Sequence, residues 1–345
     1  MKAVVALVLA LAIGGAVGAW TLRSRAQAPF KGYEAPEVFV SIPSGSSTAA
    51  IGRSLIDAGV IRDDLTFRVA LWLSGDARRL KAGEYQFAGS LTPADVLGKI
   101  ARGEVAQVSI TIREGLTIAE MAAVVEARGL ATAAAFTSAA RNAALITAID
   151  PQATDLEGYL FPETYSLPRK ADAAQLVQAM VDRFAKVLTP EMRAAATARG
   201  LSVRQLVTLA SIVEKETGNT AERAEVAAVY VNRLRIGMAL QCDPTVIYAL
   251  QKAGRFDGNL RRDDLQFDSP YNTYRYPGLP PGPIAAPGKA SLDAALQPAD
   301  GKFLYFVSRN DGTHAFAETL DEHNRNVQRF QIQYFRQRRL ANRGR

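Results

Sequence analysis

The sequence predicts an α+β protein with an N-terminal transmembrane helix, a region of α/β repeat modules and a mostly helical C-terminal domain with short strands. Three features of the sequence indicate this architecture. The chain opens with an unbroken apolar stretch, a strand–turn–helix pattern recurs between residues 40 and 130, and helical periodicity dominates after residue 171. The composition, with 48% hydrophobic and 22% charged residues among 345, is that of a folded protein.

The apolar stretch covers Ala3–Trp20. Its length suits a membrane-spanning helix and exceeds the apolar core of a typical signal peptide. A cleaved signal peptide is the alternative, because Ala26-Gln27-Ala28 resembles a cleavage site, although it follows two arginines. We expect an uncleaved anchor with a cytoplasmic N-terminus over residues 1–22 and a turn-rich linker over residues 23–37. The flanking charges alone do not decide the orientation of this span.

A strand–turn–helix pattern begins at Val40, recurs at Val108 and has a looser copy at Tyr85. Each copy has alternating apolar residues, then glycine and hydroxyl residues, then an amphipathic helix. In the copy that begins at Val108, Thr117 is the expected helix N-cap. Modules of this size cannot bury a face alone and must pack together. We expect them over residues 38–148, and the pattern alone favours a scaffold over a carbohydrate-binding region.

Helical periodicity dominates the C-terminal half of the chain. Helices are expected over Ala171–Val187, Pro190–Arg199, Ser202–Glu216 and Ala221–Ile236. Residues 259–287 are rich in proline, glycine and aromatic residues, which predicts an ordered surface loop or a cleft wall. A short strand at residues 303–307 and a basic C-terminal helix follow. We expect this domain over residues 149–337 and a basic tail over residues 338–345.

The helix expected to end at Glu216 carries this carboxylate on its apolar side. The buried stripe that runs from Leu206 to Val213 continues into Glu216, whereas Lys215 projects to the opposite side. The negative end of the helix dipole and desolvation both raise a carboxyl pKa, as a general acid near neutral pH requires. A structural role is the alternative, in which Glu216 caps a loop or pairs with a nearby arginine.

Four blocks of this sequence resemble the endolytic murein transglycosylase, or YceG-like, family. They are Ser211–Thr217, Val231–Met238, Gln241–Tyr248 and the aromatic and proline-rich Tyr271–Ile284. The resemblance covers essentially the whole chain. It implies that the repeat modules are LysM-like and bind carbohydrate, and that the C-terminal domain is a lysozyme-like catalytic domain. Cys242 departs from the family pattern, in which Ser or Thr is expected.

The resemblance implies that Glu216 is the catalytic residue of a lyase. It would protonate the glycosidic oxygen between N-acetylmuramic acid and N-acetylglucosamine and then deprotonate the muramoyl 6-hydroxyl, which leaves a 1,6-anhydro end. One carboxylate suffices for this reaction, because the substrate supplies the nucleophile. An ordinary glycosidase would need a second carboxylate, for which Glu163, Glu222, Asp243 and Asp263 are available.

The resemblance also implies a cellular role. The enzyme would be a single-pass protein of the bacterial inner membrane with the bulk of its chain outside the cytoplasm. It would cut nascent peptidoglycan strands there, terminate their elongation and lie close to peptidoglycan synthases. The alternative is a non-catalytic peptidoglycan-binding protein or divisome scaffold.

Several other side chains are candidate sugar contacts, because aromatic faces stack on pyranose rings and short polar groups reach hydroxyl and N-acetyl groups. Each has a packing or turn-forming role as its alternative. These candidates are Asp243, Tyr248, Tyr271, Asn272, Tyr274 and Glu163.

Other chemistries are disfavoured. His314 and His323 have no adjacent cysteine or carboxylate cluster, so no metal site is expected, and no cofactor is implied. Cys242 is the one cysteine, which excludes an intrachain disulfide, and we expect it to be buried. A dyad of Ser211 and Lys215 is disfavoured, since Lys215 should point to solvent. The net charge of +7 comes without any nucleic-acid-binding motif, so nucleic acid is not an expected partner.

Overall fold

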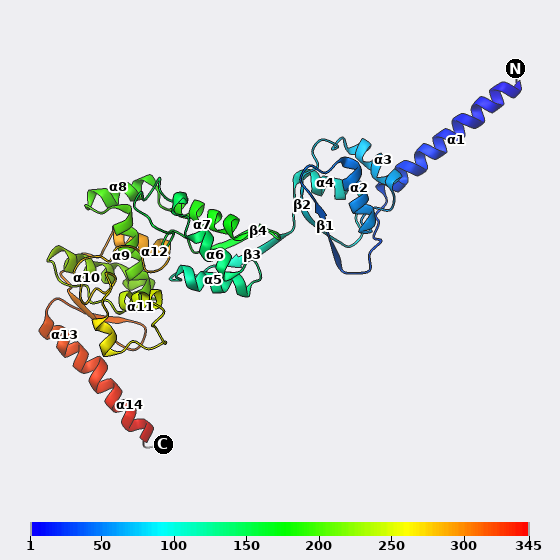
Figure 1. Ribbon diagram of the computed structural model, residues 1–345. Coiled ribbons are helices and arrows are strands. Elements are labelled where there is room, and N and C mark those ends of the chain that lie inside the picture. Colours follow the sequence, from blue (N-terminus) through cyan, green and yellow to red (C-terminus); the bar gives the residue numbers. More distant parts are fainter. Residues whose placement is uncertain (1, 344–345) are drawn as a thin grey trace. The chain divides into compact units, whose positions relative to one another are not determined.

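The computed structural model describes residues 2–343 of the chain, except for the side chains of Lys2, Ala3, Ala6 and residues 339–343. Most of the predicted basic tail, residues 338–345, therefore lies outside the described side chains. The protein is mostly helical, with short strands in two-stranded pairs (Figure 1). This confirms the predicted α+β class. The chain forms two compact units, one comprising residues 1–109 and 166–171 and the other comprising residues 110–165 and 172–345.

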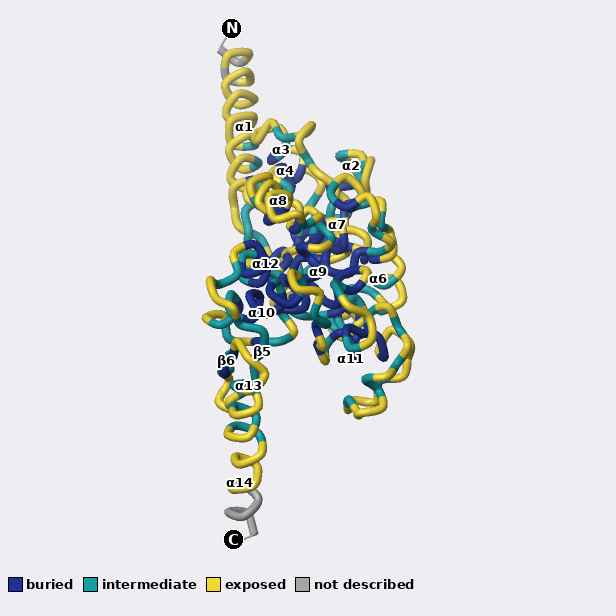
Figure 2. Tube along the Cα trace, turned by 90° about the vertical axis from the view of Figure 1, so that its left-hand side faces the viewer, coloured by how far each residue is buried: buried dark blue, intermediate teal, exposed yellow. Residues whose placement is uncertain are grey.

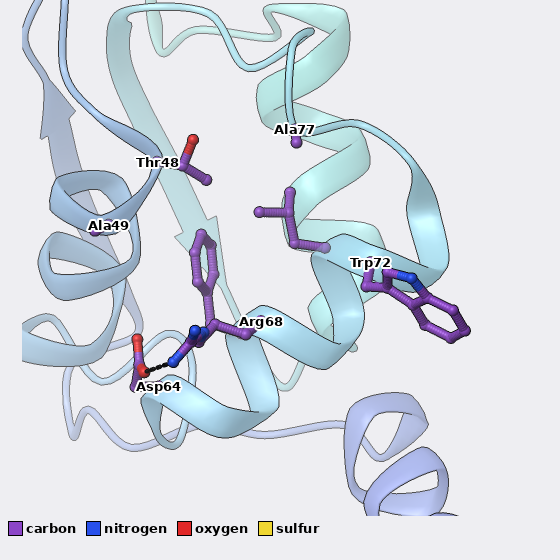
Figure 3. A pocket seen from close by; sticks show the side chains of 8 residues that line it. Thr48, Ala49, Asp64, Arg68, Trp72 and Ala77 are labelled. Carbon is purple, nitrogen blue, oxygen red and sulfur yellow. Dashed lines mark ion pairs between the residues drawn. The ribbon is translucent and has the colours of Figure 1, made fainter.

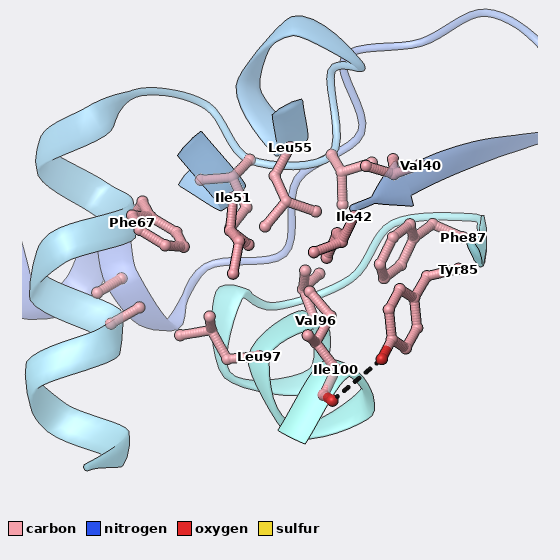
Figure 4. Close-up of a cluster of buried hydrophobic side chains, with 14 residues drawn as sticks. Val40, Ile42, Ile51, Leu55, Phe67, Tyr85, Phe87, Val96, Leu97 and Ile100 are labelled. Carbon is pink, nitrogen blue, oxygen red and sulfur yellow. Dashed lines mark hydrogen bonds between the residues drawn. The ribbon is translucent and has the colours of Figure 1, made fainter. Parts of the chain in front are cut away.

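The first unit contains four helices and one antiparallel strand pair among its described residues. Strand β1 pairs with β2 so that Val40 lies opposite Tyr85. Side chains from the inner face of this pair pack on the three short helices, and Figure 4 shows the resulting core around Leu55, Phe67 and Ile100. The elements are α1 (Lys2–Gln27), β1 (Glu37–Ile42), α2 (Thr48–Asp57), α3 (Asp64–Ser74), β2 (Gly83–Ala88) and α4 (Pro93–Arg102).

Helix α1 is the predicted apolar helix, and within the described residues Leu7–Gln27 is long and apolar enough to cross a membrane. It continues past the apolar stretch, because the residues up to Gln27 are compatible with a helix and Pro29 then prevents its continuation. The predicted linker, residues 23–37, is therefore helical in its first part. Its second part is ordered, since the backbone of Phe30 exchanges hydrogen bonds with that of Leu91.

The strand–turn–helix repeat is confirmed. Its three copies are β1–α2, β2–α4 and β3 (Gln107–Thr111) followed by α5 (Ile118–Ala127). Ser47, Thr92 and Thr117 cap the three helices, each by accepting a hydrogen bond from the third backbone N–H of its helix. The prediction that Thr117 is an N-cap is thus correct. The division between the two units falls within β3 and its partner β4 (Thr164–Pro168).

The second unit is built around helix α9 (Val203–Glu216), whose residues from Leu206 to Val213 are all buried. Helices α10 (Arg223–Arg235) and α12 (Lys289–Leu296) pack against it, and Figure 2 shows these helices in the buried part of the chain. The other elements after α5 are α6 (Ala133–Ala140), η1 (Ala143–Leu145), α7 (Ala173–Val187), α8 (Pro190–Ala198), η2 (Thr220–Glu222), α11 (Asp243–Lys252), η3 (Arg262–Gln266), β5 (Tyr305–Ser308), β6 (His314–Ala317), α13 (Leu320–Val327), η4 (Gln328–Gln333) and α14 (Tyr334–Arg343).

The four helices expected between residues 171 and 236 are confirmed as α7, α8, α9 and α10, and the strand expected at residues 303–307 is confirmed as β5 with a shifted start. Helices α11 and α12 are not among the expected elements. Helix α11 begins with Asp243-Pro244, a pair that is also typical of turns. Helix α12 has eight residues, most of them buried, so it lacks the polar face that periodicity detects.

The proline-rich segment 259–287 is an ordered, largely irregular wall, as predicted. Side chains of α9 fix its last residues: the Ser211 hydroxyl accepts a hydrogen bond from the N–H of Ile284 (3.1 Å), and Glu214 accepts one from the N–H of Gly288 (2.9 Å). Gly158 packs against the same segment and has a φ of 82°. A Cβ atom at this position would overlap the ring of Pro283.

We expect Gly158→Ala to destabilise the second unit strongly, because the substitution combines left-handed backbone strain with a steric clash. The matched control is Gly254→Ala, which has a φ of 65° and open space around its Cβ position. Backbone strain alone should cost the control about 1–2 kcal/mol. Gly158→Ala should lose about 1–3 kcal/mol more, as overpacking does. Equal losses in urea unfolding would show that the contact with Pro283 adjusts freely.

Candidate active site

Glu216 is the last residue of α9, and its side chain is half-buried. The helix starts at a capping box, in which Ser202 and Gln205 satisfy each other's backbone N–H groups. It stops at Glu216 because Thr217 is extended, with a φ of −140° and a ψ of 130°. The fully buried body of α9 therefore fixes the position of a carboxylate at its C-terminal end.

Two donors converge on one oxygen of Glu216. The Tyr230 hydroxyl, from α10, donates a hydrogen bond to Glu216 Oε1 at 2.7 Å, and the Cys242 thiol, just before α11, donates to the same atom at 3.0 Å. Both donors are buried, as predicted for Cys242. Glu216 Oε2 has no hydrogen-bond partner among the described residues. One carboxylate oxygen is thus held by the protein, and the other is available to a ligand.

Burial raises the pKa of Glu216 above its ordinary value. The hydrogen bonds from Cys242 and Tyr230 act in the opposite direction, because they stabilise the charged carboxylate, and the nearby charge of Asp243 raises the pKa again. Burial also raises the pKa of Tyr230 and of Cys242 well above their ordinary values, so both remain protonated donors. The environment therefore favours a carboxyl group that keeps its proton to a higher pH than a free glutamate.

Glu216 lies in a pocket of about 290 Å³. Asp243 and Tyr274 also line this pocket, and the Tyr274 hydroxyl donates a hydrogen bond to Asp243 Oδ1 at 2.6 Å. Phe306 from β5 and His323 from α13 contribute further walls. The structure thus brings two of the predicted sugar contacts to the predicted catalytic carboxylate.

The expected structural alternative for Glu216, a salt bridge with a nearby arginine, is not found among the described residues. Arg223 pairs with Glu214 at 2.9 Å. Arg233 lines the pocket, but its guanidinium donates to the backbone carbonyls of Leu304 (2.7 Å) and Leu240 (2.7 Å). Glu216 therefore faces the pocket without a salt bridge to any described residue.

The neighbouring polar residues of α9 have structural roles. Glu214 accepts hydrogen bonds from the Gly288 N–H and from the Ser291 hydroxyl (2.8 Å), in addition to its ion pair. The Ser211 hydroxyl donates to the carbonyl of Thr208 at 2.7 Å, and Lys215 Nζ donates to the carbonyl of Gly115 at 3.1 Å. Ser211 and Lys215 therefore do not form a dyad, in agreement with the sequence analysis.

A strained residue positions the thiol beside Glu216. Gln241 has a φ of 51°, in the left-handed region that non-glycine residues seldom adopt. Its N–H donates to the carbonyl of Thr273 at 3.2 Å, and the N–H of Cys242 donates to the Thr273 hydroxyl at 3.0 Å. The Thr245 and Thr273 hydroxyls are themselves 2.8 Å apart. This network holds the strained turn in place and aims the side chain of Cys242 at α9.

The other predicted sugar contacts do not line the Glu216 pocket. Asn272 is fully buried, and its amide donates to two backbone carbonyls of the loop before it. Glu163 pairs with Arg183 on α7. The rings of Tyr248 and Tyr271 lie 5.0 Å apart, and Tyr248 lines another pocket.

That other pocket has a volume of about 570 Å³ and lies between α5 and α11. Glu157, buried at its floor, accepts hydrogen bonds from the Ile118 N–H (3.1 Å) and the Tyr248 hydroxyl (3.3 Å). Burial nevertheless raises the pKa of Glu157 to about 8. Glu157 and Tyr230 could not be predicted as functional residues from the sequence. Neither lies in a catalytic pattern, and only the tertiary fold brings their partners to them.

A metal site is not evident in the described part of the chain, which contains no group of three or more His, Cys, Asp and Glu side chains able to hold an ion. His314 Nδ1 instead lies 2.9 Å from Glu222 Oε2, and the ring of His323 stacks on Tyr305. The Glu216 pocket contains a second carboxyl group, that of Asp243, which accepts a hydrogen bond from the Tyr274 hydroxyl, whereas Glu216 has a raised pKa and an oxygen that is available for proton transfer.

Comparison with known proteins identifies the family. Residues 40–329 match the YceG-like family. The chain belongs to this family. An endolytic murein transglycosylase of Bacillus subtilis strain 168 is 32% identical over 312 residues, which cover 85% of this chain and 84% of the relative. An endolytic murein transglycosylase of Streptococcus pneumoniae strain D39 is 32% identical, and the matched region covers 84% of this chain and 58% of that longer protein.

A solved structure supports the same assignment. The crystal structure of a yceG-like protein from Listeria monocytogenes is 33% identical and superimposes with a TM-score of 0.58 over 84% of this chain and 98% of that chain. The family predicted from the four sequence blocks is therefore confirmed, and this YceG-like protein shares its fold with a solved member.

The buried carboxyl group of Glu157 should make the stability of the second unit pH-dependent. Its folded-state pKa of about 8 exceeds its ordinary value of 4.5, so between these values the folded protein binds a proton that the unfolded chain has lost. Stability should therefore decrease as the pH rises from 4.5 to about 8 and level off above. Glu157→Gln should remove this slope.

Urea unfolding of both proteins at a series of pH values measures the effect. Tyr248→Phe is the informative control, because it removes a hydrogen bond that lowers the pKa of Glu157 and should move the upper end of the slope to higher pH. An unchanged slope in Glu157→Gln would place the titrating group elsewhere.

Proposed function

We propose that this YceG-like protein is an endolytic lytic transglycosylase that cleaves the glycan strands of peptidoglycan, with Glu216 as its catalytic acid and base. The observation that carries the proposal is the half-buried Glu216 carboxyl group, whose pKa is raised and whose Oε1 is held by Tyr230 and Cys242 in a pocket. Membership of a family with relatives named endolytic murein transglycosylase supports the substrate.

In the first step, protonated Glu216 donates its proton to the glycosidic oxygen between N-acetylmuramic acid and N-acetylglucosamine. The bond from the muramoyl C1 atom to this oxygen breaks, and N-acetylglucosamine leaves as an alcohol. A raised pKa suits this step, since it keeps a population of protonated carboxyl groups near neutral pH. The oxocarbenium-like centre that develops at C1 can be stabilised by the substrate's own acetamido group.

In the second step, the muramoyl 6-hydroxyl attacks C1, and the Glu216 carboxylate removes its proton. A bond forms between O6 and C1, which gives a 1,6-anhydromuramoyl end and restores protonated Glu216. Tyr230 and Cys242 support the charged intermediate state of the enzyme, because both donate to the carboxylate. No water and no second carboxylate take part, so the reaction is that of a lyase.

The pocket offers further contacts to the sugar. The Asp243–Tyr274 pair presents a carboxylate to hydroxyl groups and an aromatic ring to a pyranose face. We assign a substrate-binding role to these two residues. Tyr248, Tyr271, Asn272 and Glu163, which lie outside this pocket, contribute to folding or to contacts further along the strand. The reaction requires no cofactor.

We assign the cellular setting from α1 and the family. Helix α1 would anchor the protein in the inner membrane by a single span, with its N-terminus in the cytoplasm and residues 38–337 outside. In this position the lysozyme-like catalytic domain, residues 149–337, would cut nascent strands near peptidoglycan synthases and so terminate their elongation. The LysM-like modules, residues 38–148, would bind glycan.

The alternative function is a non-catalytic peptidoglycan-binding protein or divisome scaffold. A scaffold has no need of a desolvated carboxyl group with a free oxygen in a pocket, so the geometry of Glu216 favours the enzyme. Incubation of the purified protein with isolated sacculi separates the two functions. An enzyme releases fragments with 1,6-anhydromuramoyl ends, one water lighter than hydrolysis products, whereas a binding protein releases none.

Replacing Glu216 by Gln should abolish most of the activity while the fold is retained, because the amide has nearly the same shape and can still accept the hydrogen bond from Tyr230. The rate of release of anhydro products should fall by a factor of about 10²–10⁴, the usual contribution of general acid–base catalysis. The matched control is Glu163→Gln, which should keep nearly full activity. Reducing muramoyl ends from the parent enzyme would instead indicate water as the nucleophile and a second carboxylate.

The two donors to Glu216 should set the upper pH limit of activity. Replacing Tyr230 by Phe or Cys242 by Ala removes a hydrogen bond that lowers the pKa of Glu216. Because the first step needs protonated Glu216, the alkaline limb of the kcat/KM profile should move to higher pH in both variants. Cys242→Ser keeps a donor and should stay closer to the parent profile. An identical alkaline limb in all four proteins would assign that limb to another group.

A further inference from the structure

Helix α3 of the first unit has two apolar faces. One packs into the core through Phe67 and Ala70. The other is exposed: Trp72 has 81%, Leu65 51% and Leu73 40% of its surface accessible. Figure 3 shows a pocket of about 590 Å³ between α2 and α3, with the Trp72 indole at the outer end of α3 and directed away from Thr48. Within the described part of the first unit, these are the large exposed apolar side chains outside α1.

The exposed residues follow helical spacing. Leu65, half-buried Val69 and Trp72 are separated by four and three positions, so they lie on one side of α3, and Leu73 extends this side at its end. We call these four residues the outer stripe of α3. A solvent-facing stripe of this kind is unusual on a monomeric surface and indicates a contact with an apolar partner.

Helix α1 identifies the partner. It packs against α3 and α4 through one side, on which Ala26 is buried in the core and Leu22 is partly covered. Leu22 lies two residues past the apolar stretch, whose described side chains are exposed around the helix. The first unit therefore meets α1 at the end of the segment that would lie in the bilayer, and not at a distance from it.

Helix α3 begins close to the end of α1. The pKa of Asp63, the N-cap of α3, is lowered by hydrogen bonds from Thr66 and further by the nearby charge of Arg25. The start of α3 thus lies beside the end of α1. Helix α3 packs against α1, and its opposite end carries the exposed Trp72 and Leu73.

Basic residues are close to the outer stripe in the sequence. Arg78 and Arg79 follow it in the loop after α3, and Arg23 follows the apolar stretch of α1. Arg78 is exposed and has no ion-pair partner among the described residues. Tryptophan is enriched at the boundary between hydrocarbon and headgroups, and arginine is attracted by anionic lipid headgroups. The combination fits a bilayer surface better than it fits a protein partner.

We propose that the outer stripe of α3 rests in the interfacial region of the membrane beside α1, with Trp72 and Leu73 in contact with lipid. The first unit is then attached to the bilayer by two helices, one that spans it and one that lies at its surface. This inference rests on the membrane anchoring of α1 proposed above. It assigns the exposed apolar side chains to lipid and not to glycan.

The sequence offers a direct test, because Trp20 in α1 and Trp72 in α3 are its two tryptophans. Full-length Trp20→Phe and Trp72→Phe variants are placed in nanodiscs of phosphatidylcholine and phosphatidylglycerol, with or without bromine on the acyl chains. Bromine quenches tryptophan emission on contact. We expect brominated lipid to quench Trp72 in the first variant to an extent comparable with Trp20 in the second.

A further substitution tests the stripe itself. In the Trp20→Phe background, Leu73→Asp should reduce the quenching of Trp72, since a carboxylate is driven out of an anionic interface. The matched control is Ile236→Asp, an exposed apolar residue of the second unit, which should leave the quenching unchanged. Equal quenching of Trp72 in the Leu73→Asp protein and its parent would contradict the proposal.

The outcomes distinguish this inference from the anchoring on which it rests. If Trp20 is quenched and Trp72 is not, α1 spans the bilayer but the outer stripe stays in water, and the proposal fails alone. If neither is quenched, the anchoring fails as well. If soluble glycan fragments change the emission of Trp72 and brominated lipid does not, the stripe is a carbohydrate-binding surface and the proposal is wrong.

Discussion

The site depends on one interaction, the convergence of two buried donors on a single oxygen of Glu216. A half-buried carboxyl group with no donors would resist ionisation and would be a poor acid, because nothing would stabilise the carboxylate left after the proton is given up. With donors on both oxygens its pKa would fall, so that few of the carboxyl groups would be protonated near neutral pH and the carboxylate would be a weak base. Tyr230 and Cys242 stabilise the charged form through Oε1 alone. Their placement explains why α10 and the turn before α11 must both pack against the end of α9.

The polar residues of α9 have different roles in this site. Ser211 and Glu214 bind the backbone of the proline-rich segment, and Glu214 is neutralised by Arg223. Glu216, two residues further on, has no backbone donor and no salt bridge among the described residues. One buried helix therefore supplies both the side chains that fix a wall of the unit and the one side chain that is left for chemistry.

The sequence alone could predict what depends on local pattern. Apolar periodicity places Glu216 at the end of a buried helix, and the repeat places Thr117 at an N-cap. It could not predict that Tyr230 and Cys242 meet at one oxygen, because this depends on how separate helices pack. The same limit applies to the candidate sugar contacts. Asp243 and Tyr274 reach the pocket, whereas Tyr248 turns to Glu157 and forms part of another one.

The side chain at position 242 can change the pKa of Glu216 without changing the fold around it. Its backbone is fixed by Thr273, so a different side chain at this position would occupy the same place. A thiol forms weaker and longer hydrogen bonds than a hydroxyl, and it therefore stabilises the carboxylate less. Replacing the sulfur atom of residue 242 by oxygen would therefore change the pKa of Glu216 while the shape of the cleft stays the same.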